Sequence, residues 1–495
     1  MTDLELYREY QRKLKNYTYA LFIIGFDYQT VCPKKDKENS NNVQNYFYEE
    51  IIKITSSDDY FHLLVRLKDE KGLDEIEALA IKKEYENIFK QRRLPVDLIT
   101  KGIKLQSDAE LSWEMARETL DFSDFEEKLE RVLDYNFETL PYLKDKYDGF
   151  DIILTEMEDD FTEEKYDALF NKIEEEILPL VKKILAMPKK YNLDLTKEKF
   201  DIDKQRKLTK RICDLMGYTN EVGYIGETIH PFTNGINSND VRTTTKYDES
   251  LLFSNLYSVM HEVGHATYEL QNDPRFSETA LMGGASCALH ESQSRFYENY
   301  LGRSREFIEF LYPILKEIYP EQMAKYTLDD IYYYANDVSN QFTRTEADEL
   351  TYPFHIIIRY KIEKELFHKK ITVKDISSRF NELFYEYFGT MPKDKKEGCY
   401  QDIHWTSGFG YFPTYALGSA MSSQFLASME KDFNPFLDMK NGDFRRVNAW
   451  LKEHIHKYGM SKKNLEIVKI ATGEDFNPKY YIDYLKNKFK KIYEI

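Results

Sequence analysis

The chain has 495 residues, of which 31% are charged and 15% aromatic, and its formal net charge at pH 7 is −17. A charge this negative argues against nucleic acid as a partner, because binding to phosphates needs a basic surface. Glycine and proline are sparse, at 20 and 14 residues, and we find no linker rich in them. We therefore expect a single domain over 1–495, with a helical N-terminal part at 1–218 and a part at 219–495 that carries the motifs below.

An apolar run at residues 19–26 follows several basic residues near the N-terminus. The run is too short to span a membrane, and the charge of Asp27 and the lack of a small-residue cleavage site argue against a secretion signal. We interpret it as a buried helix and expect no membrane partner. The four cysteines are widely spaced without a CxxC pair, which fits reduced thiols in a cytoplasmic protein.

Long stretches that mix charged and apolar residues predict a mainly α-helical protein, as at 123–135, 162–186 and 373–388. The exception is 219–247, where glycine, proline and asparagine punctuate short apolar or threonine-rich runs. This pattern predicts a small β-hairpin or sheet packed next to the helix that follows. A strand at this position would line a cleft and hold an extended peptide by main-chain hydrogen bonds.

A helix is predicted over 248–270, with an acidic start and apolar residues at helical spacing. It contains His261 and His265, which lie one turn apart on the same face and can both bind one Zn²⁺. Between them, Glu262 can act on a water that the metal activates. Gly264 costs about 1 kcal/mol relative to alanine in a helix, which indicates that another segment approaches the backbone there.

A third metal ligand is needed, and Glu291 is the best candidate. It follows a stretch of small residues at 282–288 and lies on a predicted helix that continues to about Tyr300 and stops at Gly302. His290 competes for this role, but adjacent helical residues point about 100° apart, so only one of the two can face the metal. Two histidines and one carboxylate leave a coordination position for water, as in catalytic rather than structural zinc sites.

Further motifs stand in a fixed order along the chain. They are His230-Pro231-Phe232, Asp240-Val241-Arg242-Thr243-Thr244, HEVGH at 261–265, His290-Glu291-Ser292-Gln293, Arg344-Thr345-Glu346-Ala347-Asp348, and Gly398 to Trp405 with Gln401, Asp402 and His404, followed by a tract at 410–418 with Tyr411 and Tyr415. With this set the sequence resembles the Taq-type thermostable carboxypeptidases, a family of metal-dependent carboxypeptidases, over nearly its whole length.

The resemblance implies a large helical protein with a deep active-site groove and a small β-sheet beside the HExxH helix. It also implies an enzyme that releases single C-terminal residues from peptides with broad specificity. The expected cofactor is Zn²⁺, although sites made of nitrogen and oxygen ligands also accept Co²⁺. The expected partners are peptides with a free C-terminus, and the family implies a homodimer.

In this scheme the metal lowers the pKa of its bound water from about 15.7 to about 7. Glu262 accepts a proton from the attacking water and then delivers it to the departing amine. The oxyanion that forms needs hydrogen-bond donors, and the family motifs make His404, Tyr411 and Tyr415 the candidates. His230 is a candidate for orienting the substrate, with a loop histidine bonded to the backbone as the alternative.

A carboxypeptidase must also recognise the terminal carboxylate of its substrate, and a buried arginine does this with two hydrogen bonds. Arg344 and Arg242 lie in family motifs and are both candidates. One of them has the alternative role of a structural ion pair with Asp348 or Asp402. Together with Gln401, these aspartates are candidates for residues that support the site without touching the substrate.

Two other functions remain open from the sequence. The first is an HExxH endopeptidase or dipeptidyl carboxypeptidase of related helical fold, which would use the same metal ligands. The second is an inactive peptide-binding protein that keeps the fold. The intact set of His261, Glu262, His265 and Glu291 argues against an inactive protein.

Overall fold

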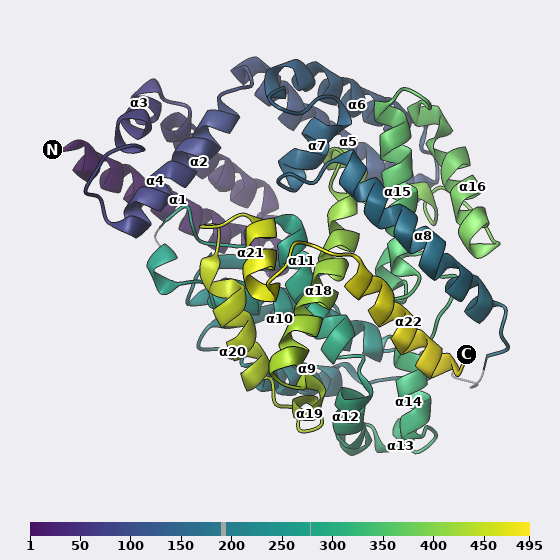
Figure 1. The fold of residues 1–495 in the computed structure, drawn as a ribbon. Helices are drawn as coiled ribbons and strands as arrows, with labels where there is room; N and C mark the ends of the chain where they lie inside the picture. The colour runs from purple at the N-terminus through teal and green to yellow at the C-terminus, as the bar shows by residue number, and fades with distance from the viewer. Residues whose placement is uncertain (190–194, 278) are drawn as a thin grey trace.

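A computed structural model describes residues 1–189, 195–277 and 279–495 of the chain, and it is mainly helical (Figure 1). The helices before the sheet are α1 (Asp3–Thr30), α2 (Lys37–Thr55), α3 (Asp58–Leu67), α4 (Glu75–Gln91), α5 (Val96–Thr119), α6 (Ser123–Leu143), α7 (Phe150–Met157), α8 (Glu163–Leu185) and α9 (Ile202–Met216). The three strands are β1 (Gly223–Glu227), β2 (Thr233–Asn237) and β3 (Asp240–Thr245).

The helices after the sheet complete the molecule. They are α10 (Leu252–Leu270), α11 (Cys287–Arg295), α12 (Arg305–Ile318), α13 (Pro320–Met323), α14 (Leu328–Ala335), α15 (Tyr352–Phe367), α16 (Ile376–Phe388), α17 (His404–Ser407), α18 (Phe412–Asp432), α19 (Pro435–Met439), α20 (Arg445–His454), α21 (Asn464–Thr472) and α22 (Lys479–Tyr493). A π-helical turn at Phe296–Leu301 continues α11 and ends at Gly302, close to the predicted end of that helix.

The periodic stretches predicted from the sequence form α6, α8 and α16. In α8 the buried residues recur at helical spacing, at Tyr166, Leu169, Ile173, Ile177 and Leu180. This spacing places all of them on the face that packs into the core, while the charged residues between them stay outside. The prediction of a mainly α-helical protein is confirmed.

The apolar run at 19–26 is helical, as predicted, but it is not a buried helix. It forms the C-terminal part of α1, where only Leu21 and Phe26 are buried and Tyr19 is 49% exposed. The reason is that α1 packs on its neighbours with one face only, so an uninterrupted apolar run necessarily leaves some side chains outside. Among the described residues, no helix is long and apolar enough to cross a membrane.

The predicted sheet is present and has three strands in the order β1-β3-β2. Strand β3 lies in the centre, parallel to β1 and antiparallel to β2, with Gly223 opposite Val241 and Thr233 opposite Thr243. Both β2 and β3 pack against α10, which carries the HEVGH motif. The alternation of the strand directs Val241, Thr243 and Thr245 inward, where all three are buried.

One large apolar core extends from Ala109 to Tyr493 and includes the inner faces of α10 and α18. Helices α1, α3 and α4 share a separate small core, built around Tyr7 and Tyr60. The helix α11 lies between α10 and α18 and packs against both. Helix α10 is buried along nearly its whole length, so polar side chains on it are presented to the interior of the molecule.

Candidate active site

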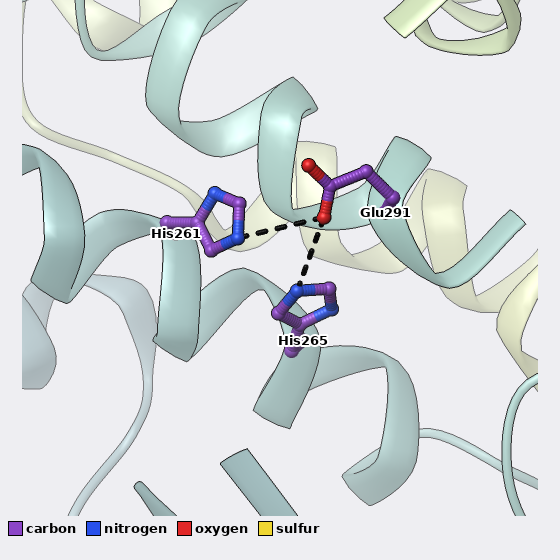
Figure 2. A group of neighbouring side chains, drawn as sticks. All are labelled: His261, His265 and Glu291. Carbon is purple, nitrogen blue, oxygen red and sulfur yellow. Dashed lines mark ion pairs between the residues drawn. The ribbon is translucent and has the colours of Figure 1, made fainter. Parts of the chain in front are cut away.

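Two neighbouring helices bring together the three residues expected to bind a metal (Figure 2). Helix α10 presents His261 and His265, and α11 presents Glu291. The Oε2 atom of Glu291 lies 3.5 Å from Nε2 of each histidine. Glu291 is 5% exposed, and the two histidines are partly buried. The convergence predicted from the spacing of the sequence motifs is therefore present in the fold.

The spacing of these atoms fits a zinc ion. Zinc bonds of about 2.0 to 2.2 Å in a tetrahedral arrangement separate neighbouring ligand atoms by about 3.3 to 3.6 Å. The separation of 3.5 Å between the carboxylate oxygen and each imidazole nitrogen lies within that range. Two imidazoles and one carboxylate are also a donor set that catalytic zinc sites use, with a position left for water.

His290, the competing ligand, lies on the other side of His265. Its Nδ1 atom is 2.6 Å from Nδ1 of His265, whereas the nitrogen of His265 that faces Glu291 is Nε2. The second ring nitrogen of His290 is 2.7 Å from Oε1 of Glu269. Glu269 was not singled out from the sequence, although its position one turn after His265 on α10 places it on the same face.

Two glycines allow α11 to approach its neighbours closely. A β-carbon at Gly264 would lie 2.9 Å from Cα of Ser294, which confirms the expectation that another segment approaches the backbone there. On the opposite side of α11, a β-carbon at Gly418 of α18 would lie 2.7 Å from the carbonyl oxygen of Ala288 and 2.9 Å from Cβ of Glu291. The position of the Glu291 carboxylate thus depends on small residues in both neighbouring helices.

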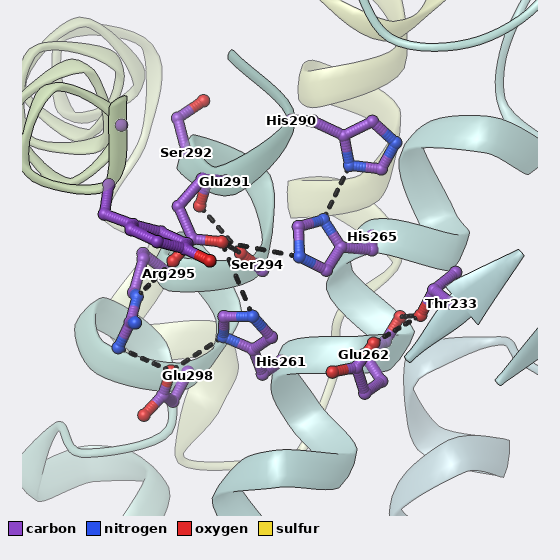
Figure 3. A network of polar contacts seen from close by, with 12 residues as sticks. Thr233, His261, Glu262, His265, His290, Glu291, Ser292, Ser294, Arg295 and Glu298 are labelled. Atoms are coloured by element: carbon purple, nitrogen blue, oxygen red, sulfur yellow. Dashed lines mark hydrogen bonds and ion pairs between the residues drawn. The ribbon is translucent and has the colours of Figure 1, made fainter. Parts of the chain in front are cut away.

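Two charged residues that were not singled out from the sequence contact the candidate ligands (Figure 3). Glu298, in the π-helical turn, accepts a hydrogen bond from Nδ1 of His261 at 2.9 Å. Arg295 donates to Glu291 at 2.7 Å and to Glu298 at 3.2 Å. Burial acts to raise the pKa of Glu291, but the charges of Arg295 and His261 outweigh it and hold this pKa well below its usual range. Arg295 and Glu298 follow Glu291 by four and seven residues, and this helical spacing could have predicted that they lie on the same face.

Glu262 lies beside the metal ligands but outside the group that they form. Glu262 is 8% exposed, and its Oε2 atom is 2.6 Å from Oγ1 of Thr233 on strand β2. Burial raises the pKa of Glu262, against the lowering effect of His261 and Thr233. A carboxylate whose pKa is raised toward neutrality is a better proton acceptor and donor at neutral pH.

Arg344 is buried and held by an ion pair. Its Nε donates to Asp402 at 2.8 Å, and its Nη1 donates to the Tyr352 hydroxyl at 3.3 Å. The other oxygen of Asp402 accepts from Arg359 on α15 at 2.7 Å, so that one carboxylate joins two arginines. The Nη2 group of Arg344 has no hydrogen bond with another described side chain, which leaves donor capacity for a ligand.

Arg242, the other candidate for carboxylate binding, lies elsewhere. Its guanidinium pairs with Asp240 two residues earlier on β3, at 3.0 and 3.1 Å, and lies over the ring of Phe26 of α1. Along a strand, successive side chains point to opposite faces of the sheet. Arg242 therefore faces α1, whereas its neighbours Val241 and Thr243 are on the buried face.

Three aromatic candidates form a cluster beside Arg344. Nε2 of His404 is 2.8 Å from the Tyr415 hydroxyl, and the ring of His404 stacks on Tyr411 with centroids 5.4 Å apart. The guanidinium of Arg344 lies 4.9 Å from the ring centre of Tyr415. Burial, and next the charge of Arg344, lower the pKa of His404 to about 4. His404 is thus neutral at physiological pH.

Asp348 and Gln401 bind backbone rather than the charged candidates. Asp348 accepts hydrogen bonds from the N–H groups of Ser339, Leu350 and Thr351, just before α15 begins. Gln401 accepts from the backbone N–H of Arg344 at 2.6 Å and donates to backbone carbonyl groups nearby. Both residues hold the segments that carry Arg344, and Asp402 is the partner that pairs with it.

A cleft of about 1530 Å³ contains these groups. Its lining includes the three metal-ligand candidates and Glu262, together with Arg344, Asp348, Gln401, Asp402, His404, Tyr411 and Tyr415. His230 is exposed at the cleft wall, and Arg242 is not among the described residues that line it. The deep groove expected from the resemblance is present.

The comparisons with known proteins agree with this arrangement. The family model of the carboxypeptidase Taq (M32) metallopeptidases matches residues 6–489. The chain belongs to this family. It is accordingly a metallocarboxypeptidase, a hydrolase of peptides.

The chain matches relatives along almost their full length. It is 36% identical to carboxypeptidase 1 of Bacillus subtilis over 97% of both chains, and 33% identical to thermostable carboxypeptidase 1 of Pyrococcus furiosus over 95% of both. The crystal structure of the M32 carboxypeptidase from Deinococcus radiodurans superposes with a TM-score of 0.95 over 100% of both chains, at 28% identity. These matches confirm the family that the sequence motifs indicated.

Proposed function

We propose that this metallocarboxypeptidase binds zinc through His261, His265 and Glu291 and releases single C-terminal residues from peptides of varied sequence. The observation that carries the proposal is the presence of a buried arginine, Arg344, in the same cleft as the three ligands. A cation in that place recognises the chain end, which an enzyme that cuts within chains does not need.

Proton transfer falls to Glu262 in this scheme. When bound, zinc would supply Lewis acidity, which lowers the pKa of water so that a hydroxide nucleophile is available at neutral pH. Glu262 takes the proton of the attacking water and transfers it to the nitrogen of the departing amino acid. The hydrogen bond from Thr233 holds the carboxylate of Glu262 in the cleft, outside the group formed by the three candidate ligands.

Tyr415 is the strongest candidate donor to the oxyanion. The Nδ1 atom of His404 is buried and has no hydrogen-bond partner among the described residues. A buried N–H without a partner is rarer than an acceptor without one, so we place the proton of His404 on Nε2. His404 then donates to the Tyr415 oxygen, and the hydroxyl proton of Tyr415 can turn from the neighbouring Tyr411 to the developing negative charge.

Arg344 is the proposed binding group for the terminal carboxylate, and Arg242 is not. Asp402, Tyr352 and the ring of Tyr415 already fix the guanidinium, so little rotational entropy is lost when a carboxylate binds. Because Asp402 accepts from one edge of the guanidinium, the substrate carboxylate would accept from the remaining N–H donors. The side chains in the cleft around it are varied, which suits broad specificity for the released residue.

The test is a digest of matched peptides followed by mass spectrometry, with one set ending in a free acid and the other in an amide. Successive loss of single C-terminal residues from the acid set, with very slow cleavage of the amide set, is the expected result. Released dipeptides or internal cuts would instead assign a dipeptidyl carboxypeptidase or an endopeptidase. Metal analysis of the purified protein, before and after exchange with zinc or cobalt, tests the cofactor.

We further propose that the chain acts in the cytoplasm as a homodimer. All four cysteines are free thiols, which suits a reducing compartment, and the dimer rests on the family resemblance. Sedimentation velocity over a range of concentrations tests the dimer, and a single species with the mass of one chain would refute it. Cell fractionation tests the location.

A further inference from the structure

We propose that His290 and Glu269 form a relay that fixes the proton on one nitrogen of His265, so that the other is kept bare for the metal. His290 and Glu269 are therefore positioning residues and not ligands. The inference rests on the proposed role of His265 as a metal ligand. It concerns side chains that line or border the cleft but that play no part in the hydrolysis described above.

Both ring nitrogens of His290 have polar contacts, and the contact with His265 is drawn in Figure 3. Nδ1 of His290 lies 2.6 Å from Nδ1 of His265, so one proton must be shared between these two nitrogens. Nε2 of His290 lies 2.7 Å from a carboxylate oxygen of Glu269, which can only accept. In a neutral His290 the proton is therefore on Nε2, and its Nδ1 atom is the acceptor.

The state of His265 follows from this assignment. Since Nδ1 of His290 accepts, the proton between the two rings belongs to Nδ1 of His265. The remaining nitrogen, Nε2 of His265, then carries no proton, and this is the atom that lies 3.5 Å from the Glu291 carboxylate within the ligand group. A metal-binding histidine needs this tautomer, because only a bare nitrogen can coordinate.

The surroundings hold the ring of His290 in place. It packs against the ring of Tyr268 at a centroid distance of 5.2 Å, and a β-carbon at Gly284 would lie 2.5 Å from its Cδ2 atom. Glu269 lies one turn after His265 on α10. His290 of α11 therefore bridges two residues of the same neighbouring helix. His261 is supported separately, by Glu298.

The experiment measures the zinc dissociation constant by competition with a chelator, together with the Tm of the metal-free protein. His290→Leu removes the acceptor and should weaken zinc binding roughly 10- to 100-fold, the usual effect of losing such a partner. His290→Asn keeps an acceptor near the former Nδ1 position and should recover part of this loss. Glu269→Gln keeps a carbonyl acceptor and should lose less than Glu269→Ala.

His456 provides the matched control. It is a fully buried histidine in the same neighbourhood, its ring 4.9 Å from that of Tyr268, and its ring nitrogens contact Gln271 and Gln293 rather than a metal ligand. His456→Leu should lower the Tm without changing the zinc dissociation constant. If His456→Leu weakens zinc binding as much as His290→Leu, general loosening of the core explains both, and the relay is refuted.

His265→Ala separates this inference from the proposed function. If His265→Ala keeps full zinc affinity, the proposed ligand set is wrong, and the relay does not act on a metal ligand. If His265→Ala loses zinc whereas His290→Leu and Glu269→Ala bind it like the wild type, the ligands stand and the relay alone is wrong. Loss in all three variants, in the order His265→Ala, His290→Leu, Glu269→Ala, supports both.

Discussion

Glu262 follows His261 directly in the sequence, yet the two side chains have different surroundings. The histidine faces Glu291 and Glu298, whereas the carboxylate of Glu262 turns toward Thr233 on β2. Neighbouring helical positions diverge by about 100°, so a single turn of α10 can present a metal ligand on one side and a proton acceptor on another.

This separation predicts that Glu262→Gln keeps the metal and loses turnover. The amide has the same shape and can still accept from Thr233, but it cannot take a proton. We expect zinc content equal to that of the wild type and a kcat lower by about 10²- to 10⁴-fold, the range for loss of a general base. Metal analysis and steady-state kinetics on the same preparation check this. A parallel loss of metal would place Glu262 among the ligands.

The proposed role of Arg344 can be measured by its substitution with alanine. Charge-assisted hydrogen bonds are worth about 1.5 to 3 kcal/mol, so Arg344→Ala should lower kcat/KM for free-acid peptides roughly 10- to 100-fold. For amidated peptides, which lack the anionic partner, the loss should be much smaller. The ratio of the two values is informative even if the variant is less stable, because both substrates meet the same enzyme.

Arg242→Ala is the comparison for Arg344→Ala. Its guanidinium pairs with Asp240 on the face of the sheet that is turned to α1, so the preference for acids over amides should stay as in the wild type. If only Arg242→Ala removes that preference, the carboxylate is bound by Arg242, and the pair of Arg344 with Asp402 is purely structural.

At the scale of helices, the site depends on how closely α10, α11 and α18 approach one another. Gly264 and Gly418 remove the side chains that would otherwise keep these helices apart. The gain in helix propensity from alanine is about 1 kcal/mol per position, so a glycine in the middle of a helix implies a compensating benefit from close packing.

Gly264→Ala tests this point. The new β-carbon would meet Ser294 at 2.9 Å and the Gln293 carbonyl at 3.0 Å, both backbone atoms that cannot move aside alone. Helices α10 and α11 must then separate, and we expect a lower Tm and a weaker zinc affinity. The control is Gly25→Ala in α1, whose β-carbon would have an ordinary contact of 3.6 Å and should leave zinc binding unchanged. Equal zinc affinity in both variants would contradict the prediction.

Helix α15 carries a buried acid, Glu363, which contacts the segment that leads into α18. One oxygen accepts from the Gly410 N–H at 3.2 Å, and the other has no hydrogen-bond partner among the described residues. Burial raises the pKa of Glu363 to about 8, against the lowering effect of Gly410 and Arg359. The acid is therefore protonated in the folded protein over a range in which it is ionised when unfolded.

The sign of the pH effect follows from this difference. Since the pKa is higher in the folded state, the stabilising contribution of the protonated acid is complete below about pH 4.3 and is lost as the pH rises to about 8. Glu363→Gln has no such proton, so its Tm relative to the wild type should rise by about 1–2 °C between pH 6 and pH 8. Calorimetry of the metal-free proteins checks this, and parallel Tm curves would refute the raised pKa.

For the whole molecule, the metal would join two helices that are separate in sequence. A ligand that binds only the folded state adds about 2.7 kcal/mol of stability at 100 times its dissociation constant. We expect added zinc to raise the Tm of the metal-free enzyme by a few degrees and to restore its activity. Glu291→Ala should show neither effect. A full Tm shift in that variant would move the binding site away from Glu291.

Much of this organisation is predictable from local sequence, because helical spacing alone places His261 and His265 together and makes Glu291 the better third ligand. Thr233 and Arg359 were not predictable, since their contacts with Glu262 and Asp402 arise only when distant segments pack together. Arg242 shows the limit of motifs: its place in a family pattern gave no information on which face of β3 it occupies. Packing also decided the exposure of the apolar run in α1.

The position of α11 between α10 and α18 has a consequence for how the enzyme is made. The helix that carries Glu291 packs on one side against α10, which precedes it in the sequence. On the other side it packs against α18, which in turn packs against α22. Contacts between segments this far apart form slowly and late in folding. On a ribosome, the HEVGH helix would emerge long before Gly418 exists. We therefore expect a nascent chain to leave the ribosome without a usable zinc site, so that metal loading, and with it proteolytic activity, begins only after synthesis has ended.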